Sequence, residues 1–152
     1  MHSGGLIKAV FRQCQISKYS CVEYLLDTDT CVDLLRNVPA VIDKMRTLAP
    51  DDCGISVITS FELFAGAARA RDPRREAQKV LALVDVVEEL SFTSDAARRA
   101  GLLRFELETA GTPIGAYDLL IASHALVLDL TLVTANAEEF GHVPGLPFET
   151  WR

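Results

Sequence analysis

Residues 22–36 of the chain read VEYLLDTDTCVDLLR. The mostly apolar run at residues 22–26 is typical of a buried strand, and residues 30–36 repeat apolar side chains at a helical spacing. Asp27 lies where the strand would end. A carboxylate in that place is costly to desolvate unless a cation or hydrogen bonds meet it, or unless it caps the helix that follows. This stretch therefore predicts a strand followed by a helix, with an acidic group at the junction.

The same alternation of short apolar runs and helical patterns continues to the end of the chain. Strands that alternate with helices are typical of an α/β sandwich around a mainly parallel sheet. In such folds ligands bind beyond the carboxyl ends of the strands. The further predicted strands are residues 55–58, 90–93, 130–134 and 148–151, and the further predicted helices are residues 41–48, 62–69, 74–88, 95–109 and 117–128.

The length of the chain, 152 residues of which 49% are hydrophobic, limits the number of domains. It is enough for one sizeable core but too little for two ordinary domains. We therefore expect one domain at residues 22–152, preceded by an extension outside the core at residues 1–21. No apolar run reaches the roughly 18 residues that a membrane span needs, so we expect a cytoplasmic protein.

Cysteine, histidine and charge patterns argue against several classes of protein. The four cysteines form no C-x-x-C pair and the three histidines show no ligand spacing relative to them, which argues against zinc and against a disulfide framework. The net charge of −6 argues against a general nucleic-acid coat. Basic residues gather between residues 69 and 104, and we interpret most of them as a solvated helical face, with one or two left to meet a phosphate backbone.

Three carboxylates, those of Asp27, Glu62 and Asp118, follow an apolar strand or a glycine-containing loop. Folding would bring them to one place, where oxygen ligands select a hard divalent ion such as Mg²⁺, with Mn²⁺ as a substitute. All three also have structural alternatives, of which the helix cap is the one for Asp27. Glu62 fits a capping box with Thr59, and Asp118 lies in a first helical turn, where the macrodipole favours a negative charge.

Residues 112–122 read TPIGAYDLLIA, which is similar to the T-P-I-G-x-[YF]-D-x-x-I-A segment of the PIN-domain endoribonuclease toxins of VapC type. The runs YLLDTD at residues 24–29, ISVITSFEL at 55–63 and LVTAN at 132–136 resemble the other motifs of that family in the same order. The tail, from Glu139 to Trp151, also looks like this group. The resemblance covers nearly everything after residue 22, and it implies a PIN-like three-layer α/β/α sandwich with a mainly parallel central sheet.

The resemblance also implies that Asp27, Glu62 and Asp118 are the catalytic acids and the metal ligands. Many relatives carry a fourth acid where this chain has Asn136, and an amide is a weaker, neutral ligand. Glu139, or a water held by Asn136, is therefore expected to fill the fourth place.

Several neighbours of these acids are expected to support the site. Asp29 stands where the family usually has Asn, so its charge could strengthen metal binding or raise the pKa of a neighbouring carboxylate. Thr134 and Ser123 are candidate hydrogen-bond donors to the ligands. His124, on the helix after Asp118, is interpreted as a core or surface residue rather than a general base.

The resemblance implies Mg²⁺-dependent hydrolysis of single-stranded or loop RNA by a metal-activated water. It further implies a toxin that a VapB-type antitoxin holds inactive, in a homodimer and a toxin–antitoxin hetero-oligomer. The apolar helical stretches at residues 32–35 and 61–68 are expected surfaces for these contacts.

Two other functions compete with this prediction. Residues 26–30, LDTDT, resemble the D-x-D nucleophile loop of haloacid-dehalogenase-like phosphohydrolases, and residues 132–134 resemble the second motif of that class. The Gly-Asp-x-x-x-Asp that this class requires afterwards is missing from the sequence. The second alternative is a non-catalytic PIN-fold interaction module, in which Asn136 has replaced an acid.

Overall fold

A computed structural model describes residues 22–152, and the predicted N-terminal extension lies outside the described residues. The core of the fold is a five-stranded sheet with the order β3-β2-β1-β4-β5, in which every pair of neighbouring strands is parallel. The mainly parallel sheet expected from the sequence is thereby confirmed. The strands are β1 (Tyr24–Leu26), β2 (Cys53–Ser56), β3 (Glu88–Leu90), β4 (Thr131–Val133) and β5 (Phe148–Glu149).

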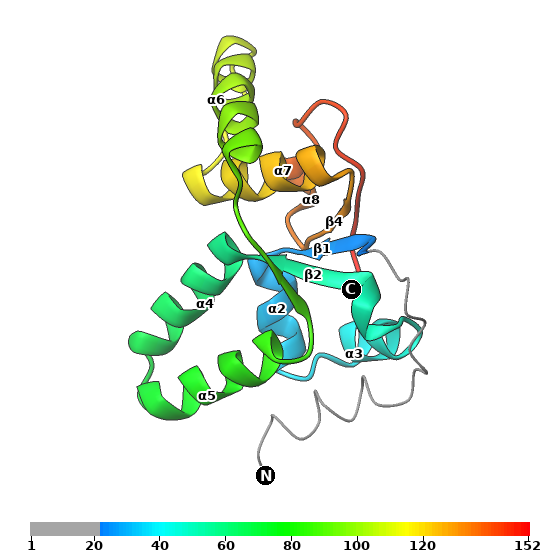
Figure 1. The fold of residues 1–152 in the computed structure, drawn as a ribbon, viewed down its shortest axis with the longest axis vertical. Coiled ribbons are helices and arrows are strands. Elements are labelled where there is room, and N and C mark those ends of the chain that lie inside the picture. Colours follow the sequence, from blue (N-terminus) through cyan, green and yellow to red (C-terminus); the bar gives the residue numbers. More distant parts are fainter. Residues whose placement is uncertain (1–21) are drawn as a thin grey trace.

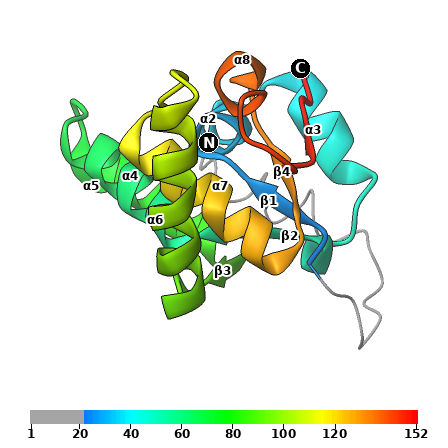
Figure 2. The same ribbon diagram turned by 90° about the horizontal axis from the view of Figure 1, so that it is seen from above.

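Helices cover both faces of the sheet, so that the domain has three layers (Figures 1 and 2). Side chains alternate along each strand, and Leu26 therefore packs with the helices of one face while Leu25 packs with those of the other. The first face carries α2 (Thr28–Leu35), α3 (Pro39–Arg46), α4 (Val57–Ala68) and α5 (Pro73–Val84); the second carries α6 (Ser94–Thr109), α7 (Ala116–Leu128) and α8 (Ala137–Phe140).

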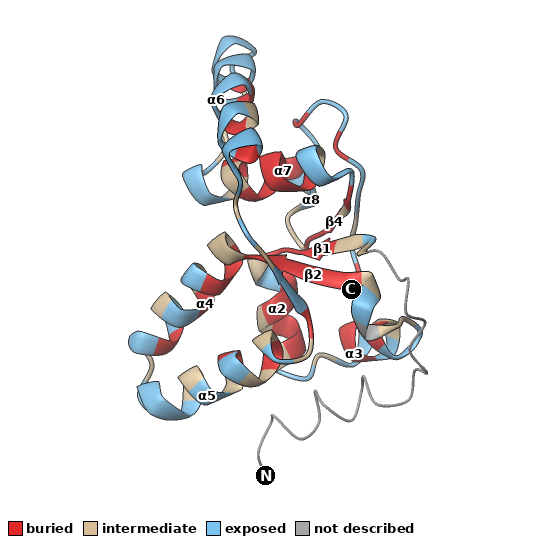
Figure 3. Cartoon of the chain, viewed as in Figure 1, coloured by how far each residue is buried: buried red, intermediate tan, exposed pale blue. Residues whose placement is uncertain are grey.

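The central strands are buried on both faces (Figure 3). Leu25, Leu26, Ile55, Leu132 and Val133 are completely inaccessible to solvent. Because a covered parallel sheet has no wet face, its strands read as continuous apolar runs, which is the pattern that revealed them in the sequence. Burial of each such side chain stabilises the fold by about 1.5–3 kcal/mol.

The junction between β2 and α4 differs from the prediction. The predicted strand at residues 55–58 ends at Ser56, whose hydroxyl accepts a hydrogen bond of 3.1 Å from the backbone N–H of Ile58 and caps α4. Thr59 is therefore inside the helix, and the expected capping box with Glu62 is wrong. The β-branched residues at 57–59 favour a strand locally, but the serine cap and the tertiary packing of the helix override that preference.

Smaller differences concern the ends of elements. Strand β3 begins at Glu88, two residues before the predicted start at Leu90. Helix α6 is capped by Thr93 rather than Ser94, and the short α8 was not predicted. A single 3₁₀ turn, Pro50–Asp52, precedes β2. Within residues 22–152, no helix combines the length and the apolar character needed to cross a lipid bilayer.

Candidate active site

Asp27 directly follows β1 at the carboxyl edge of the sheet, and its carboxylate is almost completely buried, with 2% of the residue exposed. Its Oδ1 accepts a hydrogen bond of 2.7 Å from the backbone N–H of Thr28, so it caps α2. Its Oδ2 accepts a hydrogen bond of 2.8 Å from the hydroxyl of Thr134, which follows β4. The capping role and a role in the site are thus compatible, because the two oxygens have different partners.

Burial raises the pKa of Asp27 to about 6, although the hydrogen bonds from Thr134 and Thr28 act in the opposite direction. The negative charges of Asp29 and Glu62 raise this pKa further. Asp29 is exposed in the first turn of α2 and affects the site by like-charge repulsion, one of the two effects expected from the sequence.

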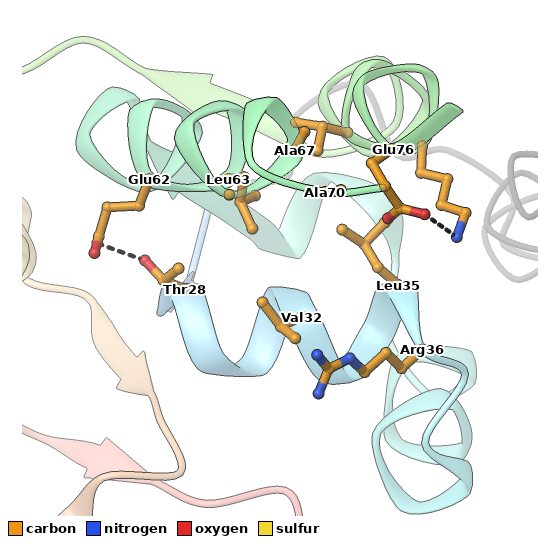
Figure 4. Close-up of a pocket in the computed structure, with 12 residues that line it drawn as sticks. Thr28, Val32, Leu35, Arg36, Glu62, Leu63, Ala67, Ala70 and Glu76 are labelled. Carbon is orange, nitrogen blue, oxygen red and sulfur yellow. Dashed lines mark hydrogen bonds and ion pairs between the residues drawn. The ribbon is translucent and has the colours of Figure 1, made fainter. Parts of the chain in front are cut away.

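Glu62 lies in the second turn of α4, facing α2 across a narrow gap (Figure 4). The hydroxyl of Thr28 donates a hydrogen bond of 2.7 Å to Glu62 Oε1. Thr28 therefore contacts two of the three predicted ligands, Asp27 through its backbone and Glu62 through its side chain. Thr28 was not among the residues predicted for the site, although a hydroxyl next to the first acid was a signal for such a role.

Asp118 lies in the first turn of α7, where its carboxyl group forms a hydrogen bond with the carboxyl group of Glu139 on α8. A hydrogen bond between two carboxyl groups requires a proton. Burial and the charges of Asp27 and Glu139 raise the pKa of Asp118 to about 7, whereas a hydrogen bond from the backbone N–H of Gly115 holds the pKa of Glu139 below its usual value. A proton that the pair binds therefore resides on Asp118 rather than on Glu139.

Both oxygens of Glu139 are fixed by neutral donors. Oε1 accepts a hydrogen bond of 2.6 Å from the backbone N–H of Gly115, and Oε2 accepts one of 2.6 Å from the side-chain amide of Asn136. The backbone N–H of Asn136 in turn donates to the Thr134 hydroxyl at 2.9 Å. A hydrogen-bonded chain thus connects the first acid to the last, in the order Asp27, Thr134, Asn136, Glu139, Asp118.

The four acids interact electrostatically across the site. The charges of Asp27, Glu139 and Glu62 all raise the pKa of Asp118. In their present rotamers, however, no three acidic, histidine or cysteine side chains among residues 22–152 are grouped closely enough to hold an ion. Each carboxylate instead makes the hydrogen bonds described above. Burial and mutual repulsion oppose the ionisation of Asp27 and Asp118 near neutral pH.

Two other candidates from the sequence do not contact these acids. His124 is completely buried on α7 and shares a hydrogen bond of 2.9 Å between its Nδ1 and the hydroxyl of Ser56, the cap of α4. Burial lowers the pKa of His124, so the ring is neutral and acts as a core residue, as expected. Ser123 donates to the backbone carbonyl of Leu119 and not to a ligand.

Four of the six basic residues of α5 and α6 form ion pairs with acids nearby. These ion pairs are Lys79–Glu76, Arg98–Asp95, Arg99–Glu106 and Arg104–Glu108. Such exposed pairs contribute little to stability and are typical of a solvated helical face, which agrees with the interpretation of the sequence.

Comparison with known proteins identifies the class of protein to which this fold, with its acids at the carboxyl edge of the sheet, belongs. The PIN-domain profile matches residues 24–146. The tRNA(fMet)-specific endonuclease VapC of Salmonella typhimurium is 37% identical over 130 residues, which are 86% of this chain and 98% of that protein. The chain therefore belongs to the PIN-domain family and, within it, to the VapC-type proteins, as the motifs indicated.

Two further relatives agree with this assignment. Ribonuclease VapC2 of Rickettsia felis is 35% identical, over 84% of this chain and 97% of its own. In the crystal structure of DNA-bound VapBC from Salmonella typhimurium, the matching chain superimposes with a TM-score of 0.82 at 37% identity, over 86% of this chain and 99% of that one. The expected three-layer PIN fold is thereby confirmed.

Proposed function

We propose that this protein is an endoribonuclease that hydrolyses RNA phosphodiester bonds with Mg²⁺, or with Mn²⁺ as a substitute, and that it acts as the toxin of a toxin–antitoxin pair. The observation that carries the proposal is the mutual electrostatic effect of four acids at the carboxyl edge of the sheet. The names of the Salmonella and Rickettsia relatives, an endonuclease specific for tRNA(fMet) and a ribonuclease, support the choice of RNA as the substrate.

The ligand chemistry of the acids fits a hard divalent ion, which would draw their side chains together from the rotamers that they adopt here. Their ligand atoms are all oxygens, and burial together with the neighbouring acids raises the pKa values of Asp27 and Asp118, so that a cation would favour their ionised forms. Asp27, Glu62 and Asp118 would hold the ion, with Glu139 in the fourth place. A bound Mg²⁺ would supply the positive charge that an RNA phosphate needs at this acidic edge and would activate a water for in-line attack.

The neutral side chains keep the acids in position. Thr28 and Thr134 orient the Asp27 carboxylate from opposite sides, and Thr28 also restrains Glu62. Asn136 holds Glu139 beside Asp118. In this arrangement Asn136 acts as a positioning residue for the fourth acid.

A groove beside the acids suits the antitoxin. It has a volume of about 290 Å³ and lies between α2, α4 and α5, with Thr28 and Glu62 among its lining residues (Figure 4). The solved Salmonella relative is a VapBC complex, and we propose that an apolar segment of a VapB-type antitoxin binds here and extends a basic side chain to the carboxylates. Further lining residues are Val32, Leu35, Leu63, Ala67 and Val80, which include both apolar stretches expected as contact surfaces.

The experiment that tests the activity is cleavage of a complex RNA pool by the purified protein with and without Mg²⁺. Wild-type protein should cleave RNA only with the ion, and Asp27→Asn or Asp118→Asn should abolish cleavage while circular dichroism shows an intact fold. Asp129→Asn is the matched control, because Asp129 is an exposed cap of α7 with a positive φ of 56° that asparagine also tolerates. Hydrolysis of a phosphomonoester without RNA cleavage would favour the phosphohydrolase alternative, and the absence of any Mg²⁺-linked stabilisation would favour a non-catalytic module.

A further inference from the structure

Two exposed aromatic residues each come directly before a proposed ligand in the sequence, on the same helix as that ligand. Phe61 on α4 immediately precedes Glu62, and Tyr117 on α7 immediately precedes Asp118. Their ring centroids are 5.3 Å apart and their planes are inclined by 59°. The two residues are 52% and 46% exposed. We refer to Phe61 and Tyr117 together as the aromatic pair.

The packing of the domain does not account for the aromatic pair. The ring contact between Tyr24 and Trp151 involves a tryptophan that is only 8% exposed, and the contact between Phe92 and His124 involves a fully buried ring. These contacts belong to the interior, whereas each member of the aromatic pair leaves about half of its surface in water. The two rings contact each other at the surface, between the two helices that carry Glu62 and Asp118, and keep contact area available for a ligand.

The charge of the site limits how RNA can be held there. Among the ion pairs of the described residues, none joins a lysine or arginine to Asp27, Glu62, Asp118 or Glu139. One bound cation compensates for repulsion at one phosphate, but the adjoining nucleotides need another source of affinity. Stacking of a base on an aromatic ring does not depend on charge and is available only to unpaired bases.

We propose that the aromatic pair is a stacking platform for an unpaired nucleobase next to the phosphate that is cleaved. This inference rests on the proposed ribonuclease function and adds to it the residues that select single-stranded RNA. Because the rings are inclined rather than parallel, one base stacks on the exposed surface of the pair and is not sandwiched between the two rings. Phe61 and Tyr117 thus position the substrate, while the acids carry the chemistry.

The test uses the full-length protein with Mg²⁺ and a fluorescent single-stranded RNA that the wild type cleaves. Phe61→Leu combined with Tyr117→Leu should raise KM by about tenfold, within the range measured when a stacking ring is removed, and should leave kcat nearly unchanged. Tyr117→Phe keeps the ring and should therefore raise KM far less than the double leucine variant does. Phe105→Leu is the matched control, because Phe105 is 70% exposed on α6 and lies outside both the aromatic pair and the acids.

A second set of substrates separates stacking from a general structural effect. Each carries one base-free nucleotide, at successive positions around the cleaved bond. With the wild type, the substrate that lacks the stacked base should raise KM by about the same factor as the double substitution does. With the double variant, the same substrate should cause no further rise in KM, since the lost contact is the same. A merely structural role would leave the two losses additive.

The outcomes distinguish this inference from the function on which it rests. Unchanged KM values in the double variant, with normal cleavage by the wild type, would overturn the stacking platform and leave the ribonuclease proposal intact. If the double variant instead loses self-association or antitoxin binding while KM is unchanged, the pair is a protein interface and the inference is wrong. Failure of the wild type to cleave any RNA would remove both proposals.

Discussion

The side chain of Thr28 donates a hydrogen bond of 2.7 Å to Glu62, joining the start of α2 to the second turn of α4. The same residue uses its backbone N–H to hold Asp27. One short residue therefore sets the relative position of two acids that lie 35 positions apart along the chain. Substitutions at Thr28 can test how much the site depends on such support.

Replacing Thr28 by valine keeps the β-branched shape and the backbone bond to Asp27 but removes the bond to Glu62. We expect Mg²⁺ affinity and kcat/KM to fall by about ten- to 100-fold, the usual loss when a residue that orients a metal ligand is removed. Thr28→Ser, which retains the hydroxyl, is the control. Equal Mg²⁺ titration curves for the valine variant and the wild type would show that Glu62 needs no such restraint.

The raised pKa values give the metal-free protein an unusual pH dependence. Between the ordinary aspartate pKa of 3.8 and the folded value of about 6, the folded Asp27 binds more protons than the unfolded one, so stability falls as pH rises. Asp27 alone would contribute a loss on the order of 2–3 kcal/mol by about pH 8. Urea unfolding in EDTA should show greater stability near pH 5 than near pH 8 from this contribution.

Magnesium should reverse that trend, because it stabilises the ionised acids. Added Mg²⁺ should raise the melting temperature near pH 8 more than near pH 5. The variant Asp27→Asn should lose the share of both effects that Asp27 contributes, since its side chain does not ionise, whereas Asp118, whose pKa is also raised, keeps its own share. A pH profile that is identical in the variant and the wild type would contradict the assignment of the titration to this carboxylate.

Glu139 is expected to act as the fourth acid. Glu139→Gln removes its charge, so the pKa of Asp118 should fall while Mg²⁺ binding weakens by about tenfold or more. Glu138→Gln is a matched control, because Glu138 is an exposed neighbour on the same short helix. Calorimetric titration with Mg²⁺ measures the difference between the two variants, and equal affinities would exclude Glu139 from the site.

The contact between His124 and Ser56 fastens α7, which carries Asp118, to the cap of α4, which carries Glu62. His124→Leu leaves the buried Ser56 hydroxyl without this partner and should lower the free energy of unfolding by about 1–3 kcal/mol. A double-mutant cycle with Ser56→Ala isolates the pair from the general effect of changing a core residue. A coupling energy near zero would show that the hydrogen bond contributes nothing net.

The architecture and the identity of the acids could be predicted because each leaves a local trace. Buried strands such as β1 and β4 are short apolar runs, and Asp27 follows one of them directly. The hydrogen bonds that link the acids to one another leave no such trace in the sequence. Only the pairing of Leu26 with Val133 places Asp27 beside Thr134, and this register depends on residues more than 100 positions apart. The same is true of the bond that joins Asn136 to Glu139, since α8 was too short to be recognised.

The position of β1 in the middle of the sheet has a consequence for the motions of the domain. The backbone N–H of Asp27 donates to the carbonyl of Val133 at 2.8 Å, between two strands that have neighbours on both sides. Amide hydrogens there exchange with solvent only when the whole domain opens, whereas those of the peripheral α5 exchange through local fraying. A partner that enters or leaves the groove could therefore loosen α5 repeatedly while the first acid stays in its place.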